Sequence, residues 1–172
     1  MRQAAVHRSS GRRGRAKAVP RARRAPFGHI EHADALVIDL DPGADVSWDF
    51  VVASALRMRD IMEDDGLKPW PKLTGGKGIH VVAPLERAMT HDAAHVYARR
   101  LAQRLVGTAP DRFVTSAALA RRPGKLFVDY LRNGRGTTAV GTYSPRARPG
   151  FPIAAPVTWR QITPSPLGSS RK

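Results

Sequence analysis

The stretch Ala35-Leu-Val-Ile-Asp-Leu-Asp-Pro-Gly43 is an apolar run that ends in two aspartates and a turn. A short apolar run of this kind predicts a buried β-strand, and the Pro-Gly pair ends it abruptly. Asp39 and Asp41 flank Leu40, so their side chains emerge on the same face of the strand. Two carboxylates this close repel each other unless a cation lies between them. The alternative is that one aspartate caps the turn while the other faces solvent.

Outward from this strand, helical and strand patterns alternate along the chain. Ser47 can cap a helix that runs to about Asp65, where Gly66 follows, and Thr90 can cap a second helix to about Val106. Further strands are expected near residues 68–73, 79–83, 112–116 and 126–131, with a helical turn near 159–162. We therefore predict an α+β fold, a mixed or antiparallel sheet flanked by helices, because several links are short enough to join antiparallel neighbours.

Composition divides the 172 residues into three parts. Residues 1–29 are rich in Arg, Ala, Gly and Pro and lack hydrophobic periodicity, which predicts a disordered basic arm. Residues 30–163 carry the periodic segments and are long enough for one domain with a core. Residues 164–172 are expected to form a flexible tail.

Positive charge is concentrated at both ends of the chain, and the formal net charge is +15. Residues 1–30 contain nine Lys or Arg and no acid, and residues 93–172 contain fourteen Lys or Arg against two acids. A basic surface neutralises phosphates and releases counterions, which favours DNA or RNA as a partner. The alternative is a solvated surface on a protein that uses arginine in place of lysine.

The chain has no cysteine, which excludes disulfide frameworks, thiol catalysis and cysteine-bound zinc or iron–sulfur centres. A metal would have to be held by carboxylate or imidazole groups, which favours hard ions such as Mn²⁺ or Mg²⁺. No apolar run approaches the roughly 18 residues that span a bilayer, and the N-terminus lacks the apolar core of a signal peptide. We therefore expect a cytoplasmic, nucleoid-associated protein without membrane contact.

A third acid, Asp129, lies in the apolar run 126–131, within a region almost free of negative charge. It can be a salt-bridge partner for a nearby arginine, or a metal ligand supplied by a neighbouring strand. Together with Asp39 and Asp41 it would suit a two-metal site for phosphoryl transfer, in which the ions activate the attacking oxygen and stabilise the leaving group.

The segment Thr74-Gly-Gly-Lys-Gly-Ile-His80 is a glycine-rich turn between two expected strands. Its three glycines, Gly75, Gly76 and Gly78, allow the backbone to approach a phosphate closely, and Thr74, Lys77 and His80 add donors. The spacing is not that of a Walker A loop. An ordinary hairpin is the alternative interpretation.

Four segments in this order resemble the polymerase domain of bacterial ATP-dependent DNA ligase D, in the archaeo-eukaryotic primase superfamily. The segments are Val37-Ile-Asp-Leu-Asp-Pro-Gly, Lys72-Leu-Thr-Gly-Gly-Lys-Gly-Ile-His-Val, Phe127-Val-Asp-Tyr-Leu-Arg-Asn-Gly-Arg-Gly-Thr-Thr-Ala and Tyr143-Ser-Pro-Arg-Ala-Arg-Pro-Gly. The resemblance covers about residues 30–162. It implies a primase-polymerase core that adds nucleotides, often ribonucleotides, to DNA 3′ ends in non-homologous end joining, with manganese preferred.

Site residues follow from the resemblance by motif match. It makes Asp39, Asp41 and Asp129 the catalytic metal triad, and assigns the turn from Thr74 to His80 to the incoming triphosphate. It gives Arg146 a further phosphate contact, and it assigns DNA contacts to Arg122 and Arg132. Thr74 stands where the family more often has serine, which keeps the hydroxyl group.

The family carries a longer segment before its first aspartate motif, with parts that bind a 5′-phosphate and stack on the template. Here the arginine-rich arm occupies that place, which implies an N-terminally truncated domain: a stand-alone remnant, a subunit missing its partner, or a truncated reading frame. The expected partners are DNA ends, nucleoside triphosphates, a separate DNA ligase and an end-binding protein. A second hypothesis is a non-catalytic basic module that binds DNA ends for another protein.

Overall fold

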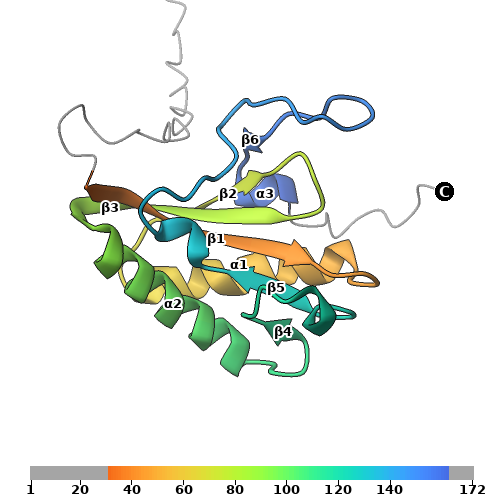
Figure 1. Cartoon of the computed structure of the whole chain (residues 1–172), viewed down its shortest axis with the longest axis horizontal. Helices are drawn as coiled ribbons and strands as arrows, with labels where there is room; N and C mark the ends of the chain where they lie inside the picture. The colour runs from red at the N-terminus through yellow and green to blue at the C-terminus, as the bar shows by residue number, and fades with distance from the viewer. Residues whose placement is uncertain (1–30, 163–172) are drawn as a thin grey trace, which may run out of the picture.

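The computed structural model describes residues 31–162, so the arm expected at residues 1–29 and the tail expected at 164–172 lie outside the described part. Helices and strands alternate along it (Figure 1). In chain order the elements are β1 (His32–Pro42), α1 (Trp48–Asp64), β2 (Trp70–Leu73), β3 (Ile79–Thr90), α2 (His91–Gly107), β4 (Phe113–Val114), η1 (Leu119–Arg121), β5 (Leu126–Asp129), η2 (Leu131–Asn133), β6 (Ala155–Pro156) and α3 (Trp159–Ile162).

The six strands form one sheet in the order β4-β5-β1-β3-β2-β6. All pairs are antiparallel except β4 with β5, so the mixed sheet expected from the sequence is confirmed. The long strands β1 and β3 lie at its centre, and both edge strands are only two residues long. Short edges present few unpaired backbone groups to other chains.

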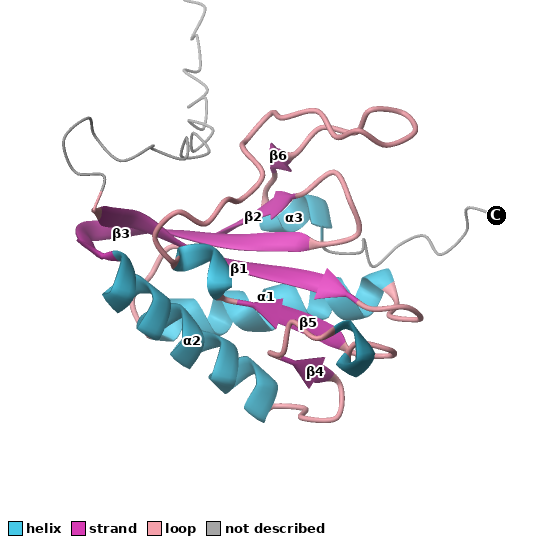
Figure 2. Ribbon diagram, in the orientation of Figure 1, coloured by secondary structure: helices cyan, strands magenta, loops and turns pink. Residues whose placement is uncertain are grey.

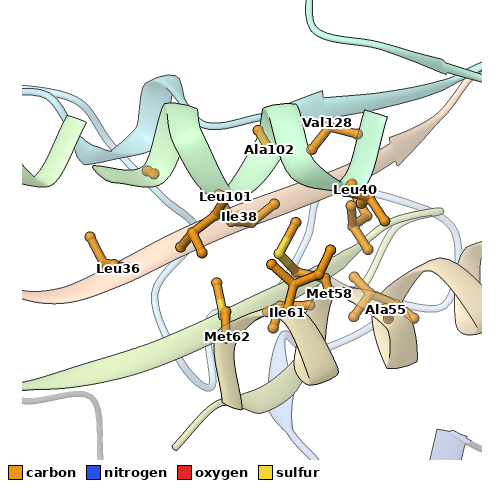
Figure 3. Close-up of a cluster of buried hydrophobic side chains, with 14 of the residues drawn as sticks. Leu36, Ile38, Leu40, Ala55, Met58, Ile61, Met62, Leu101, Ala102 and Val128 are labelled. Carbon is orange, nitrogen blue, oxygen red and sulfur yellow. The ribbon is translucent and has the colours of Figure 1, made fainter. Parts of the chain in front are cut away.

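Both long helices, α1 and α2, lie on the same face of the sheet (Figure 2). Strand β1 alternates, and its side chains Leu36, Ile38 and Leu40 are fully buried against the helices. Figure 3 shows them packed against methionines of α1 and against Leu101 of α2. The intervening side chains of β1, which include Asp39, project from the opposite face. One strand thus supplies both the core and the polar face.

The helix caps agree with the sequence. The Ser47 hydroxyl oxygen accepts a hydrogen bond from the Phe50 N–H (3.3 Å), and the Thr90 hydroxyl oxygen accepts one from Ala93 (3.3 Å). Gly66, with φ of 77°, follows the C-cap of α1. Within the described residues, no helix has the length and apolar character that a membrane crossing requires.

Several boundaries differ from the sequence-based expectation. Strand β3 continues beyond residue 83 to Thr90, because its pairing with β1 resumes after an irregularity: Ala35 pairs with Pro84 and Ala33 with Met89, so the extra residues lie in β3. Strand β5 ends at Asp129 rather than at residue 131, because the 3₁₀ turn η2 follows. Only two residues pair where a strand was expected at 112–116, and β6 was not predicted.

Candidate functional site

A row of polar side chains crosses four strands on the face opposite the helices. The pairing places Asp129 of β5 beside Asp39 of β1, Asp39 beside His80 of β3, and His80 beside Lys72 of β2. Directly opposed residues of antiparallel strands project from the same face. Asp41, two residues after Asp39, projects from that face as well. The sheet therefore brings the three predicted aspartates and His80 together from separate segments.

Each of these carboxylates faces a cationic or imidazole nitrogen. Asp39 Oδ2 lies 3.2 Å from His80 Nε2 and 3.7 Å from Arg132 Nη2. Arg132 also bridges to Asp129, with 3.1 Å between Nε and Oδ2. Arg122 Nη1 donates to Asp41 Oδ2 over 3.1 Å. Arg122 and Arg132, expected to contact DNA, are thus placed directly at the carboxylates.

The carboxylates provide hard oxygen donors of the kind that Mg²⁺ and Mn²⁺ prefer. Burial raises the pKa of the Asp41 carboxyl and the charge of Asp39 raises it further, so negative charge is unfavourably concentrated here. Within residues 31–162, however, no three His, Asp or Glu side chains are grouped closely enough to hold a metal ion. Their oxygens face arginine and histidine groups instead. The oxygen chemistry of these carboxylates suits a divalent cation, whereas their spacing in this structure is set by the ion pairs.

The glycine-rich turn connects β2 to β3 and lies against β1. A Cβ atom on Gly78 would lie 2.6 Å from the Leu40 carbonyl oxygen, so only glycine allows this approach. Gly75 has φ of 69°, and a Cβ there would meet the Arg146 side chain at 2.8 Å. The Thr74 hydroxyl accepts from the Gly76 N–H (3.3 Å) and donates to the Gly78 carbonyl (3.1 Å). Thr74, expected to contact the triphosphate, therefore shapes the turn itself.

A cleft of about 450 Å³ opens between this turn, the carboxylates and the segment 138–148. Its cationic lining comes from Lys77, Arg132, Arg146 and the exposed Arg148. The residues around it are Asp39, Asp41, Thr74, Gly76, Lys77, Gly78, His80, Arg132, Thr138, Ala139, Val140, Arg146 and Arg148. The buried Nδ1 of His80 has no hydrogen-bond partner among the described residues. The cleft is suited to an anionic ligand.

A smaller cleft of about 230 Å³ adjoins the first and shares Asp41 and Arg132 with it. Arg122 forms one side, where its guanidinium lies 3.9 Å from the centre of the Phe127 ring and donates to the Ala117 carbonyl (3.1 Å). Ring stacking and two hydrogen-bond acceptors fix the orientation of this arginine. The two clefts meet at the carboxylates.

Three residues at the site were missed by the sequence reasoning. Lys72 is buried, and its Nζ donates to the Val140 carbonyl over 2.7 Å, although its same-face spacing with Thr74 was visible in the sequence. The buried Asn133 exchanges two 2.8 Å hydrogen bonds with the backbone of Val37, a contact that no local pattern announces. Arg148 lines the larger cleft, and its position two residues after Arg146 was the available signal.

The assembled site can be compared with known proteins. A family model described as "LigD, primase-polymerase domain" matches residues 16–170. The chain belongs to this family. It is 38% identical over 133 residues to the multifunctional non-homologous end joining protein LigD of Pseudomonas aeruginosa, which covers 77% of this chain and 16% of that protein. With LigD of Mycobacterium tuberculosis it shares 37% over 130 residues, covering 76% of this chain and 17% of the relative.

A solved structure gives the same relationship. The fold matches the polymerase domain of Mycobacterium tuberculosis ligase D in complex with DNA, with a TM-score of 0.74 and 37% sequence identity. The match covers 76% of this chain and 46% of that one. The chain thus spans less than a quarter of the length of these curated relatives, and about half of the solved domain.

Proposed function

We propose that this chain transfers nucleotides to the 3′ ends of DNA in non-homologous end joining, using a divalent cation, Mn²⁺ or Mg²⁺, held by Asp39, Asp41 and Asp129. The observation that carries the proposal is the row of carboxylates at the junction of two clefts, the larger of which is lined by cations. A nucleotidyl transferase needs two substrates that meet at one point. When bound, the cation would activate the attacking hydroxyl and neutralise charge on the phosphates.

The larger cleft suits the triphosphate of an incoming nucleotide. Lys77, Arg146 and Arg148 line it and would neutralise the phosphate oxygens through charge-assisted hydrogen bonds. His80, which pairs with Asp39, also lines this cleft. The glycines of the turn would let backbone N–H groups approach the phosphates.

The smaller cleft suits the 3′ end of the DNA strand being extended. The 3′ hydroxyl would attack the α-phosphorus from this side, and pyrophosphate would leave toward the larger cleft. Arg122 and Arg132 would neutralise the last DNA phosphates, and both would have to exchange their carboxylate partners for them. The ion pairs would then be released in the step that loads the cation and the substrates.

Primer extension on a gapped duplex with Mn²⁺ or Mg²⁺ tests the proposal. Asp41→Asn should reduce incorporation by orders of magnitude, because it removes a charged ligand at the reaction centre. Asp111→Asn, which changes an exposed acid in a loop away from the clefts, is the matched control and should retain activity. Incorporation by Asp41→Asn at the control's level would refute the assignment of the triad. DNA binding without incorporation by the unaltered chain would favour the non-catalytic end-binding module.

A further inference from the structure

The segment between η2 and β6 rises above the sheet and doubles back on itself (Figure 1). Its two arms are joined as a short antiparallel ribbon, with an isolated bridge between Pro145 and Ile153. Backbone hydrogen bonds run from Ala154 N to Ser144 O (3.0 Å) and from Arg146 N to the carbonyl opposite it (2.9 Å). The segment is therefore an ordered two-faced element, here called the ribbon (residues 143–154).

The inner face of the ribbon lies against the body of the protein. Ala154 is fully buried, and Arg146 lines the larger cleft. A Cβ on Gly75 would touch the Arg146 side chain and two backbone atoms of the other arm, so the ribbon lies directly over the glycine-rich turn. Whatever binds the ribbon therefore lies next to the proposed nucleotide site.

The outer face carries large apolar side chains that the protein leaves in solvent. Tyr143 is 67% exposed, Phe151 is 73% exposed and Ile153 is 55% exposed. All three lie on the two arms of this one short element, on its solvent-exposed side. Several large exposed apolar side chains on one short element mark a binding surface more often than a single exposed residue does.

Two of these residues also adopt an unfavourable backbone conformation. Tyr143 has φ of 65° and Phe151 has φ of 43°, a region that bulky side chains rarely adopt. Neither ring gains burial in return. Retained backbone strain without compensating packing is typical of positions kept for binding.

The charge around the ribbon selects the chemistry of its ligand. The chain contains no Asp or Glu after Asp129, whereas Arg146 and Arg148 lie within the ribbon. An apolar protein partner would not require this one-sided charge. Both arginines reach the glycine-rich turn, so they lie along the border between the ribbon and the larger cleft. Exposed aromatic rings on a segment whose border carries arginines match single-stranded nucleic acid, whose bases stack on rings while its phosphates meet cations.

We propose that the outer face of the ribbon binds unpaired bases of a DNA strand next to the larger cleft, with Tyr143 and Phe151 as stacking platforms. The identification of the bound strand as DNA rests on the proposed function. Stacking is tolerant of sequence, since every base has a planar face. This surface would hold a single-stranded overhang beside the incoming nucleotide whatever its sequence.

The test uses the full chain, with EDTA present and no nucleotide, so that it does not depend on catalysis. The probes are a blunt duplex and the same duplex with a short single-stranded overhang that contains 2-aminopurine. The double variant Tyr143→Asn, Phe151→Asn removes both rings, and asparagine tolerates the left-handed conformation. The exchange variant Tyr143→Phe, Phe151→Tyr keeps both rings, and Val96→Gln changes an exposed apolar residue on α2.

We expect the double asparagine variant to lose about tenfold in affinity for the overhang duplex, because a stacked base contributes about 1–3 kcal/mol. Affinity for the blunt duplex should stay the same, and 2-aminopurine emission, quenched by stacking, should recover in this variant alone. The exchange variant and Val96→Gln should behave like the unaltered chain. Unchanged overhang affinity, or equal loss for both duplexes, would overturn the proposal. A change seen only in self-association by light scattering would also overturn it and assign the face to a second copy.

Failure of the stacking proposal can be distinguished from failure of the proposed function. A chain that extends primers but binds overhangs independently of the rings would keep the proposed function and lose this one. A chain that never incorporates nucleotides, yet loses overhang binding and quenching with the two rings, would keep the stacking surface and lose the enzyme.

Discussion

Replacing Lys72 by methionine should weaken nucleotide binding without weakening the fold. The Lys72 side chain is only 6% exposed, and its Nζ donates a 2.7 Å hydrogen bond to the carbonyl of Val140. The residues Thr138–Val140 form one wall of the larger cleft. Lys72 therefore acts on the ligand through this wall, as a positioning residue. Methionine fills a similar volume but cannot donate.

The magnitude follows from two opposing effects. A hydrogen bond from a charged donor contributes about 1.5–3 kcal/mol, which sets an upper limit of about tenfold to a hundredfold in nucleotide affinity. The wall keeps a second anchor, the 3.1 Å hydrogen bond from Arg132 to the Thr138 carbonyl, so we expect the lower end. Burial lowers the pKa of Lys72, so the folded state disfavours the charge that methionine removes. The recovered desolvation cost should offset the lost bond, leaving stability within about 1 kcal/mol.

Steady-state primer extension with varied nucleotide concentration separates the two effects. For Lys72→Met the KM for the nucleotide should rise about tenfold while kcat changes little, and urea unfolding should show a near-normal midpoint. Lys68→Met, which changes an exposed lysine just before β2, is the matched control and should alter neither. An unchanged KM would refute the positioning role. A large loss of stability would show that the lysine serves the core rather than the cleft.

Three further predictions concern the framework of the site. Asn133→Ala removes three hydrogen bonds to backbone groups and should lower the unfolding free energy by about 3 kcal/mol in urea titrations. A loss below about 1 kcal/mol would show that these bonds do not hold η2 to β1. Gly78→Ala drives a Cβ into the β1 backbone and should cost about 1–3 kcal/mol, while Gly107→Ala, which meets open space, should not destabilise; equal thermal midpoints would disprove the close approach. Burial and the hydrogen bond to Asp65 raise the pKa of Tyr97, so its stabilisation is complete below about pH 10 and is lost as pH rises through the raised value. Tyr97→Phe should flatten this loss of stability at alkaline pH in denaturation curves. An unchanged pH profile would show that Tyr97 does not cause the loss.

Local patterns predicted those features that depend on neighbouring residues. Ser47 and Thr90 cap their helices as expected, because capping is decided within one turn. The spacing of Asp39 and Asp41 put both acids on one face before any partner strand was known. The family motifs then indicated which segments belong together, and the sheet brings Asp129 beside Asp39.

Features that depend on distant segments were missed or misjudged. The apolar run of β3 stops near Pro84, but pairing with β1 carries the strand to Thr90. Lysine is usually exposed, and the burial of Lys72 depends on Val140, far along the chain. The sequence of the ribbon shows no strand pattern, because its two arms pair only through an isolated bridge between Pro145 and Ile153.

Strand β1 carries site residues and core residues at alternating positions. Leu40 is fully buried between Asp39 and Asp41, so a slip of one residue in the pairing would turn the acids into the apolar layer and the leucine into the cleft. Asn133 opposes such a slip, because its amide binds both the N–H and the carbonyl of Val37. The same turn, η2, carries the arginine that bridges two of the acids. The hydrogen bonds of Asn133 that fix the register therefore also set the position of the Arg132 guanidinium over the carboxylates. A variant that loosens these bonds should lose alignment of the site before it loses the fold.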